Sequence, residues 1–216
     1  MSTNIASKIF DSVSKTYDIF LNFITFGYIH KLQNNLIEKT PLGENIVDIG
    51  TGTGEILKKI NDKNNNSLLI GIDVSKNMLL KAKEKVPNAN LLIADAENLP
   101  FKNKSIDNIF FSLVFRHLNQ ENTTQELKRV IKKNGYVSIL DLSKNKLLLF
   151  LFDKIFKPFG RLIFSKKEYD YFIDSIKWAK SIEELEELFK KNDFECIYKK
   201  KYLFGLAIIV IFKKSS

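Results

Sequence analysis

The 216-residue sequence contains a single cysteine, Cys196, only two histidines, four prolines and nine glycines. One cysteine cannot close an intrachain disulfide, and no group of Cys and His residues has the spacing of a zinc site. We therefore expect a protein of a reducing compartment without a metal site. The low proline and glycine content also excludes collagen-like and low-complexity chains.

Long hydrophobic runs are absent as well. No segment offers roughly 18 uninterrupted apolar residues, and the N-terminus lacks an apolar run followed by a small-residue cleavage site. The sequence thus predicts a protein that is neither secreted nor membrane-spanning, and we expect it in the cytoplasm. An apolar fraction of 44% suits one globular domain, with or without a small lid.

Acidic residues are fewer than basic ones, 25 against 34, which gives a formal net charge of +9. Residues 144–167 hold seven basic residues, one acid and twelve large apolar residues. This pattern is typical of an interfacial segment that meets an anionic bilayer or a greasy substrate, although a core helix with a solvated basic face is the alternative. Nucleic-acid binding is disfavoured, because aromatic residues on nucleic-acid surfaces usually accompany Gly and polar residues.

From Asn45 onward, short apolar runs alternate with helical patterns, which is typical of βαβ units and a parallel sheet. We expect five mostly parallel strands, at residues 46–50, 68–73, 91–94, 106–112 and 136–142. We expect helices at residues 55–60, 75–85 and 120–132, with Ser75 as an N-cap and Asn134-Gly135 as the stop of the third helix. The fold class is therefore α/β, a Rossmann-like doubly wound sheet with helices on both faces.

The pattern changes at both ends of this region. Residues 144–167 look inserted, and a helix at 181–190 opens with a capping box formed by Ser181 and Glu184. Two further runs, residues 194–201 and 206–212, are close enough to pair as a C-terminal antiparallel hairpin. Residues 1–40 predict amphipathic helices that end before Thr40-Pro41, and we interpret them as a helical lid on a domain of residues 41–216.

Glycines follow the first strand directly, in the run Ile-Val-Asp-Ile-Gly-Thr-Gly-Thr-Gly at residues 46–54. Gly50, Gly52 and Gly54 let backbone N–H groups approach a ligand, and the N-terminus of the next helix favours a carboxylate. Asp48 suits a ligand that also carries an ammonium group, whereas it would repel a pyrophosphate. A plain tight turn is the alternative.

Polar residues also end the next two strands. Asp73 can accept both hydroxyls of a ribose, although a lone Asp there can instead cap a helix. Asp95 and Ala96 could receive an adenine edge, with Val74 and Met78 on the ring faces, and Met78 fits a plain core equally well. These strand ends share one crevice, where open α/β sheets bind ligands. An NAD site would require G-x-G-x-x-G instead.

The fourth strand ends at Ser112 and leads into Leu-Val-Phe-Arg-His-Leu. We expect Arg116 and His117 on the substrate side of the same crevice, where an Arg can hold an oxyanion. His117 has an ordinary pKa of about 6.5, which suits a general base, but an isolated His more often packs or caps. His30, in the expected lid, is interpreted as a surface or packing residue.

These residues resemble class I S-adenosylmethionine-dependent methyltransferases, and specifically the ubiquinone/menaquinone biosynthesis C-methyltransferase family. The resemblance rests on residues 9–18, 26–27, 30–31, 47–54, 71–78, 94–101, 140–144 and 169–176. The glycine turn identifies only the superfamily, whereas Tyr17-Asp18 and residues 169–176 are more restrictive. The chain departs from the family where it has Leu-Val-Phe-Arg-His at residues 113–117, since the family often has Phe-Gly-Leu-Arg-Asn. The segment between Ser143 and Tyr169 is shorter than is usual in the family.

The resemblance implies S-adenosylmethionine as the cofactor and a prenylated quinol as the methyl acceptor. Contacts to the cofactor are implied for Thr53, Asp73, Asp95, Ala96 and Ser112, with Tyr17 closing over its methionine end. Arg116 would stabilise a phenolate, and His117 or Tyr169 would assist the loss of its proton.

The segment at residues 144–167 would take the prenyl tail at the inner face of the membrane, as a peripheral contact. Three alternatives stay open: a methyltransferase of another small lipid or metabolite, an RNA methyltransferase, and a non-catalytic protein that binds the cofactor or a membrane. The pattern predicts no particular oligomeric state.

Overall fold

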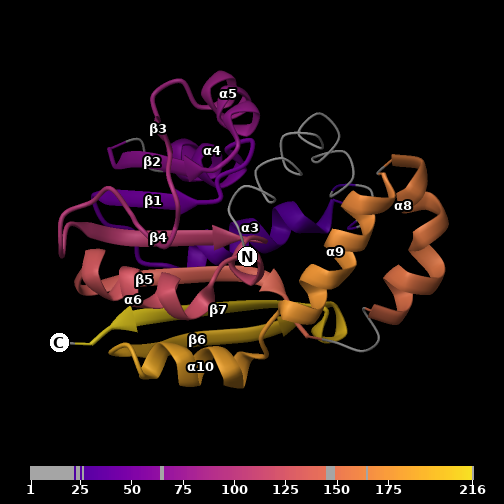
Figure 1. Ribbon diagram of the computed structural model, residues 1–216. Coiled ribbons are helices and arrows are strands. Elements are labelled where there is room, and N and C mark those ends of the chain that lie inside the picture. Colours follow the sequence, from indigo (N-terminus) through magenta and orange to yellow (C-terminus); the bar gives the residue numbers. More distant parts are fainter. Residues whose placement is uncertain are drawn as a thin grey trace.

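The computed structural model describes residues 22, 25, 27–63, 66–144, 149–163 and 165–215. Seven strands of the described chain form one sheet (Figure 1). They are β1 Asn45–Ile49, β2 Leu68–Asp73, β3 Asn90–Ile93, β4 Ile106–Ser112, β5 Ile131–Leu142, β6 Phe194–Tyr202 and β7 Ala207–Lys214. The helices are α3 Tyr28–Lys39, α4 Glu55–Lys63, α5 Lys76–Lys85, α6 Gln120–Val130, α8 Lys157–Ile163, α9 Lys166–Trp178 and α10 Ile182–Lys190.

The sheet has the order β3-β2-β1-β4-β5-β7-β6. Strands β1 to β5 are parallel, and β7 runs antiparallel between β5 and β6. This arrangement confirms the expected Rossmann-like sheet with a C-terminal hairpin. The strand order reverses between β1 and β4, so the crevice at their carboxyl ends is the position where such sheets bind ligands.

Side chains alternate between the two faces of each strand. On β1, Val47 and Ile49 join the core that includes residues of α6 and α10, whereas Ile46 joins the core that includes residues of α3 and α4. Both faces of the sheet are therefore covered by helices, which explains why its central strands are nearly continuous apolar runs.

Helix α3 packs directly on the sheet. Its buried stripe, which includes Leu32 and Leu36, shares one core with Leu140 of β5 and Ile209 of β7. The described part of the expected lid thus contributes to the core of the sheet domain. Residues 1–21, including Tyr17, lie outside the described residues.

The expected stop of the third helix was wrong. Helix α6 ends at Val130, and Ile131 is already extended, with its N–H bonded to the carbonyl of Leu127. Strand β5 starts there, and its pairing with β4 is irregular between the Ile131 and Tyr136 positions. Asn134, with φ 62°, and its glycine neighbour lie in this irregularity and not at a helix end.

Beyond β5 the chain forms a helical region outside the sheet, which we call the outer module: residues 149–163 and 165–178. It comprises a π-helical segment η2, Leu151–Phe156, followed by α8 and α9. Figure 1 shows this module in orange, past the end to which the arrows of β1 and β4 point. A small core that includes Phe152 and Ile176 holds it together. No helix within the described ranges is long and apolar enough to cross a membrane.

Candidate active site

The glycine turn after β1 has three residues in the left-handed region. Gly50, Gly52 and Gly54 have φ of 68°, 53° and 82°, which L side chains rarely adopt. A Cβ on Gly50 would lie 2.4 Å from the side chain of Val114, and one on Gly54 would lie 3.1 Å from Ala82. A Cβ on Gly52 would meet nothing within 4 Å. The turn is packed at its two ends and leaves space for a ligand at its centre.

Asp73, at the end of β2, holds the centre of this turn. Its Oδ2 accepts the N–H of Gly52 at 2.9 Å, and its Oδ1 accepts the N–H of Ser75 at 2.9 Å. The side chain of Ser75 caps α5, as expected. Because each carboxylate oxygen can accept a second hydrogen bond, these contacts are compatible with ribose hydroxyls at the same group. The ribose contact stays a prediction.

Asp48 is a buried acid, with 1% of its surface exposed. The hydroxyl of Thr51 donates to its Oδ2 at 2.7 Å, while its Oδ1 has no hydrogen-bond partner within the described part of the chain. Burial, opposed by the Thr51 hydrogen bond and assisted by the charge of Asp73, raises the pKa of Asp48 to about 7. An unpaired buried acceptor is costly, so this site fits a ligand that carries a cationic hydrogen-bond donor.

Thr53 is fixed from outside the turn. Lys85 of α5 donates to its hydroxyl at 3.2 Å and also pairs with Glu55 at the start of α4. Burial opposes the charge of Glu55, but the hydrogen bond and charge of Lys85 still lower its pKa. His30 approaches Glu55 at 3.8 Å, so it lies where α3 meets α4. Thr53 is buried, and its implied contact to the cofactor stays a prediction.

Of the four residues expected around the adenine, two are buried in the core and two are partly exposed. Met78 and Ala96 are 1% and 3% exposed, and Ala96 belongs to the core beneath the sheet. Val74 and Asp95 are partly exposed, and Asp95 accepts the N–H of Glu97 at 3.0 Å. The packing alternative is therefore favoured for the side chain of Met78, while Asp95 lies at the surface of the crevice.

Gln33 was missed by the sequence reasoning. Its amide donates to the hydroxyl of Ser112 at 3.3 Å, and its Oε1 has no hydrogen-bond partner within the described residues. The side chain is 6% exposed on the buried stripe of α3. A polar residue at an apolar helix position is the signal that could have revealed it. Gln33 thus places a second unpaired acceptor beside the end of β4.

Arg116 belongs to a short helical turn, η1 Phe115–His117, after β4. Its Nη1 donates to Asp141 Oδ1 at 2.5 Å and to the carbonyl of Leu113 at 2.6 Å, and its Nε donates to Ser175 of α9 at 3.2 Å. Arg116 and Asp141 are 5% and 4% exposed. Leu113 has φ 63°, a strained value for a side chain of this kind. The guanidinium is thus a buried, oriented ion-pair partner.

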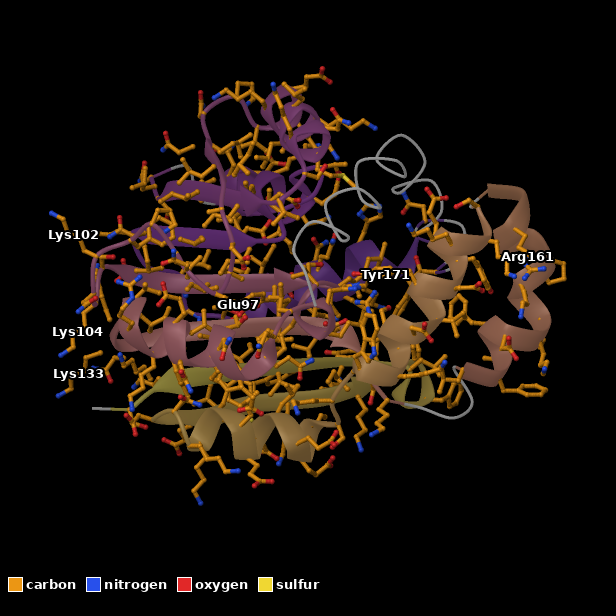
Figure 2. The ribbon with its side chains drawn as sticks, in the orientation of Figure 1. Glu97, Lys102, Lys104, Lys133, Arg161 and Tyr171 are labelled. Atoms are coloured by element: carbon orange, nitrogen blue, oxygen red, sulfur yellow. The ribbon has the colours of Figure 1, made fainter. Side chains whose placement is uncertain are left out.

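His117 faces the outer module. Its Nδ1 lies 3.1 Å from the hydroxyl of Tyr171, and the two rings stack at 5.4 Å with an interplanar angle of 9°. Burial, and then the charge of Arg116, lower the pKa of His117 well below its usual value. Figure 2 labels Tyr171, a residue of α9, where this helix approaches the strand ends. His117 is therefore neutral at neutral pH and is positioned by α9.

Tyr169 has a different environment from the one expected. It is fully buried, its hydroxyl donates to the carbonyl of Phe152 at 2.5 Å, and burial raises its pKa to about 12. A Cβ on Gly160 would lie 2.1 Å from its ring, so the missing side chain lets α8 pack against it. These contacts favour a packing role for Tyr169 in place of proton transfer.

The site therefore has two parts at the same end of the sheet. The glycine turn, Asp48 and Asp73 form a cradle with open space and an unpaired buried acceptor. Beside it, η1 carries Arg116 and His117, both of which contact α9. Such an arrangement can hold a cationic nucleoside next to a second, less polar substrate.

Comparisons with known proteins agree with this geometry. The profile of the ubiE/COQ5 methyltransferase family matches residues 2–214. The ubiquinone/menaquinone biosynthesis C-methyltransferase UbiE of Rickettsia bellii is 30% identical over 227 residues, covering 95% of this chain and 91% of that relative. The demethylmenaquinone methyltransferase of Chlamydia caviae is 29% identical, covering 96% and 95%.

Solved structures confirm the fold. A chain from the complex between the Haloferax volcanii Trm112 methyltransferase activator and a putative methyltransferase has a TM-score of 0.74 at 17% identity, covering 96% of this chain and 98% of its own. A SAM-dependent methyltransferase of Thermotoga maritima, described as a possible histamine N-methyltransferase, has a TM-score of 0.69 at 21% identity, covering 97% and 99%. Identities this low establish the shared architecture alone.

Proposed function

Because the chain belongs to the ubiE/COQ5 methyltransferase family, we propose that this S-adenosylmethionine-dependent methyltransferase methylates a ring carbon of a prenylated quinol, of the demethylmenaquinol type. The observation that carries the proposal is the extent of the family match. It spans residues 2–214, so it includes the outer module as well as the glycine turn. The acceptor named for the relatives is therefore supported by similarity in both parts of the site.

S-adenosylmethionine, when bound, supplies an electrophilic methyl group on a sulfonium. In the proposed site, Asp48 accepts a hydrogen bond from the ligand's ammonium group through its unpaired Oδ1. The open space at Gly52 admits the ligand backbone, and Asp73 accepts from the ribose hydroxyls while it holds the turn. Ser112 and the unpaired Oε1 of Gln33 extend the polar surface toward β4.

The acceptor carbon is a weak nucleophile until the neighbouring phenol loses its proton. The electron density on the ortho carbon would then form a bond to the methyl group as the bond between that methyl group and the sulfonium sulfur breaks. S-adenosylhomocysteine would leave as the neutral thioether, and the ring proton would pass to water, which restores the aromatic ring. Neutral His117 is the proposed group that accepts the phenolic proton, directly or through water. The protein must also hold the carbon about 3–3.5 Å from the methyl group and exclude water.

Arg116 acts in this proposal as an oriented group beside the phenolate oxygen. Its charge is already paired with Asp141 in a buried site, so it supplies hydrogen-bond geometry more than net charge. Because Ser175 and Tyr171 of α9 contact Arg116 and His117, the outer module sets the position of both side chains.

The prenyl tail of such a quinol partitions into a bilayer, and the segment at residues 144–167 suits a peripheral contact with an anionic membrane. Within its described part, Phe150 and Ile155 are 56% and 49% exposed. Lys154 and Arg161 are exposed beside them in sequence. Apolar and basic side chains together favour the interface of an anionic membrane.

Purified protein, labelled S-adenosylmethionine and a reduced demethylmenaquinone analogue with a short prenyl chain test the proposal. We expect label in the quinone ring and a product heavier by one methylene. A His117→Ala variant should keep cofactor binding and lose most of the methyl transfer. Cofactor binding without any label in the quinol, together with transfer to an unrelated acceptor, would reject the proposed substrate.

A further inference from the structure

The hairpin between β6 and β7 ends in an unusual turn, η3 Leu203–Gly205. Leu203, Phe204 and Gly205 have φ of 50°, 55° and 85°. Bulky residues rarely adopt the left-handed region, which costs on the order of 1–3 kcal/mol for each residue held there. Phe204 is 98% exposed, so the strained backbone presents an aromatic side chain almost entirely to solvent.

This exposure differs from that of other apolar surface residues. Leu80 on α5, for example, is 55% exposed, and it lies on a regular helix whose backbone is unstrained. Single exposed apolar residues of that kind are common on protein surfaces. Phe204 differs, because a strained turn holds its ring almost fully in solvent, where it adds nothing to the cores formed by the described residues.

The turn is attached to the outer module. Immediately after it, Leu206 packs against the small core of Phe152 and Ile176. The carbonyl of Leu206 also accepts the N–H of Ser143, at the end of β5, at 3.0 Å. Phe150, which is 56% exposed, precedes Phe152 by two residues. Phe204 and Phe150 thus project from two segments that share one core.

The charge around these apolar projections is basic. Residues 149–178 contain six basic residues and four acids, and five of the basic residues but only one of the acids lie in residues 149–167. That acid, Asp153, is paired with Lys154 at 3.1 Å and with Lys157 at 3.0 Å. Lys200, on the strand that leads to the turn, is exposed and lies over the ring of Tyr202. The potential near the turn therefore favours an anionic surface.

We propose that Phe204 is a membrane anchor, which inserts into the interface of an anionic lipid bilayer while the basic side chains of the outer module contact the headgroups. The inference rests on the proposed quinol substrate, because a prenyl tail requires the enzyme to reach a bilayer. It adds the β6–β7 turn, far from residues 144–167 in sequence, as a second point of contact. Two apolar insertions with basic residues bind a bilayer more firmly than either does alone.

Sedimentation of the full-length protein with vesicles tests the anchor. We expect binding to vesicles of phosphatidylcholine with phosphatidylglycerol and weak binding to phosphatidylcholine alone. Phe204→Asn removes the ring and tolerates the left-handed backbone, and we expect about tenfold weaker partitioning, since the apolar side chain no longer leaves water. Leu80→Gln, the matched control on α5, should partition like the wild type. Equal partitioning of Phe204→Asn and wild type would overturn the proposal.

A second pair of variants tests the electrostatic part. Figure 2 shows Arg161 at one end of the molecule and Lys102 and Lys133 at the opposite end. We expect Lys154→Gln with Arg161→Gln to weaken binding to anionic vesicles several-fold. Lys102→Gln with Lys133→Gln removes the same charge and should have little effect. If both double variants weaken binding equally, the protein binds by net charge and the oriented anchor is excluded.

The outcome can be separated from that of the proposed function. Phe204→Asn should methylate a water-soluble short-chain quinol at the wild-type rate, but it should lose activity on a long-chain quinol held in vesicles. If wild type methylates the short-chain quinol yet ignores vesicles, the anchor alone is refuted. If Phe204→Asn instead converts a dimer to a monomer in light scattering and leaves vesicle binding intact, Phe204 contacts a second copy and the proposal is overturned.

Discussion

The cofactor cradle and the outer module are built on different principles. In the cradle, position is set by backbone: glycines in the left-handed region, a turn held by Asp73 and strands in fixed register. Where η1 meets the outer module, position is set by side chains, through the Arg116 ion pair with Asp141, the His117 contact with Tyr171 and the burial of Tyr169. A cradle positioned by the backbone suits a ligand that many enzymes share. Side chains between η1 and the outer module can instead be substituted to suit a different methyl acceptor.

The largest effect is expected at the junction of the two regions. Asp141→Asn leaves Arg116 as a buried charge without its partner, which costs about 3–5 kcal/mol when one member of such a pair is lost. We expect the free energy of unfolding in urea to fall by that amount. Asp174→Asn, which breaks an exposed pair with Lys177, should change it by less than about 1 kcal/mol. If the two variants lost the same unfolding free energy, the buried ion pair at the junction would stabilise the protein no more than an exposed pair does.

The glycine turn offers a comparison within the cradle. Gly50→Ala should destabilise the protein by about 2 kcal/mol or more, because its Cβ would press on Val114 at a left-handed position. Gly52→Ala has the backbone penalty but meets no neighbour, so it should cost about 1 kcal/mol of stability while its methyl group occupies ligand space. Urea unfolding with calorimetry of S-adenosylhomocysteine binding separates the two. If the Gly52→Ala protein bound S-adenosylhomocysteine with wild-type affinity, the open space at Gly52 would not be part of the cofactor site.

The next largest effect is expected on the affinity for S-adenosylhomocysteine, which should depend on the cradle and not on the outer module. Asp73→Ala should weaken S-adenosylhomocysteine binding by about 1–3 kcal/mol, roughly five- to more than a hundredfold, because a buried acceptor for ribose is lost. Tyr171→Phe removes only the hydroxyl that contacts His117, so it should leave this affinity unchanged and lower the rate of methyl transfer. Titration calorimetry and a steady-state assay check both. Unchanged affinity in Asp73→Ala would exclude Asp73 from the site.

The smallest effect is the pH dependence of binding. The folded-state pKa of Asp48 is about 7, above its ordinary value of 3.8, so the free protein holds a proton there below that pH. The ammonium group of the ligand favours the ionised form of Asp48, so affinity for S-adenosylhomocysteine should rise several-fold from pH 6 to pH 8. The same shift makes the free protein lose stability as pH rises from about 4 to about 7. Asp48→Asn should flatten both profiles, and a profile identical to that of wild type would contradict the assignment.

The cradle was largely predictable because its determinants are local. A strand that ends in Asp48 and three glycines, followed by a helix, leaves few backbone solutions, and Ser75 was readable as a cap for the same reason. The end of α6 was not readable, since tertiary pairing of Ile131 with β4 overrides the local Asn-Gly signal. Local patterns thus predicted the backbone of the glycine turn and the cap of α5, while the cofactor contacts of this turn stay predictions.

The part of the site between η1 and the outer module depends on contacts between residues that are far apart in the sequence. Asp141 stands 25 residues from Arg116, and Tyr171 stands 54 residues from His117. No spacing rule connects such pairs in a single sequence. Tyr169 illustrates the limit, because the family resemblance suggested chemistry, whereas its burial, its hydrogen bond to Phe152 and the close approach of Gly160 favour packing. Gln33 had a sequence signal, a polar residue on an apolar helix face, but the contact of its amide nitrogen with Ser112 had none.

Amide hydrogen exchange of the full-length protein tests the division of the site most directly. With S-adenosylhomocysteine alone, we expect slower exchange in the glycine turn, Gly50 to Gly54, and little change in α9. A short-chain quinol added to that complex should then slow exchange in η1 and α9. Unchanged exchange in the glycine turn of saturated protein, or protection of α9 by the nucleoside in place of the turn, would contradict the assignment of the two ligands to the two regions.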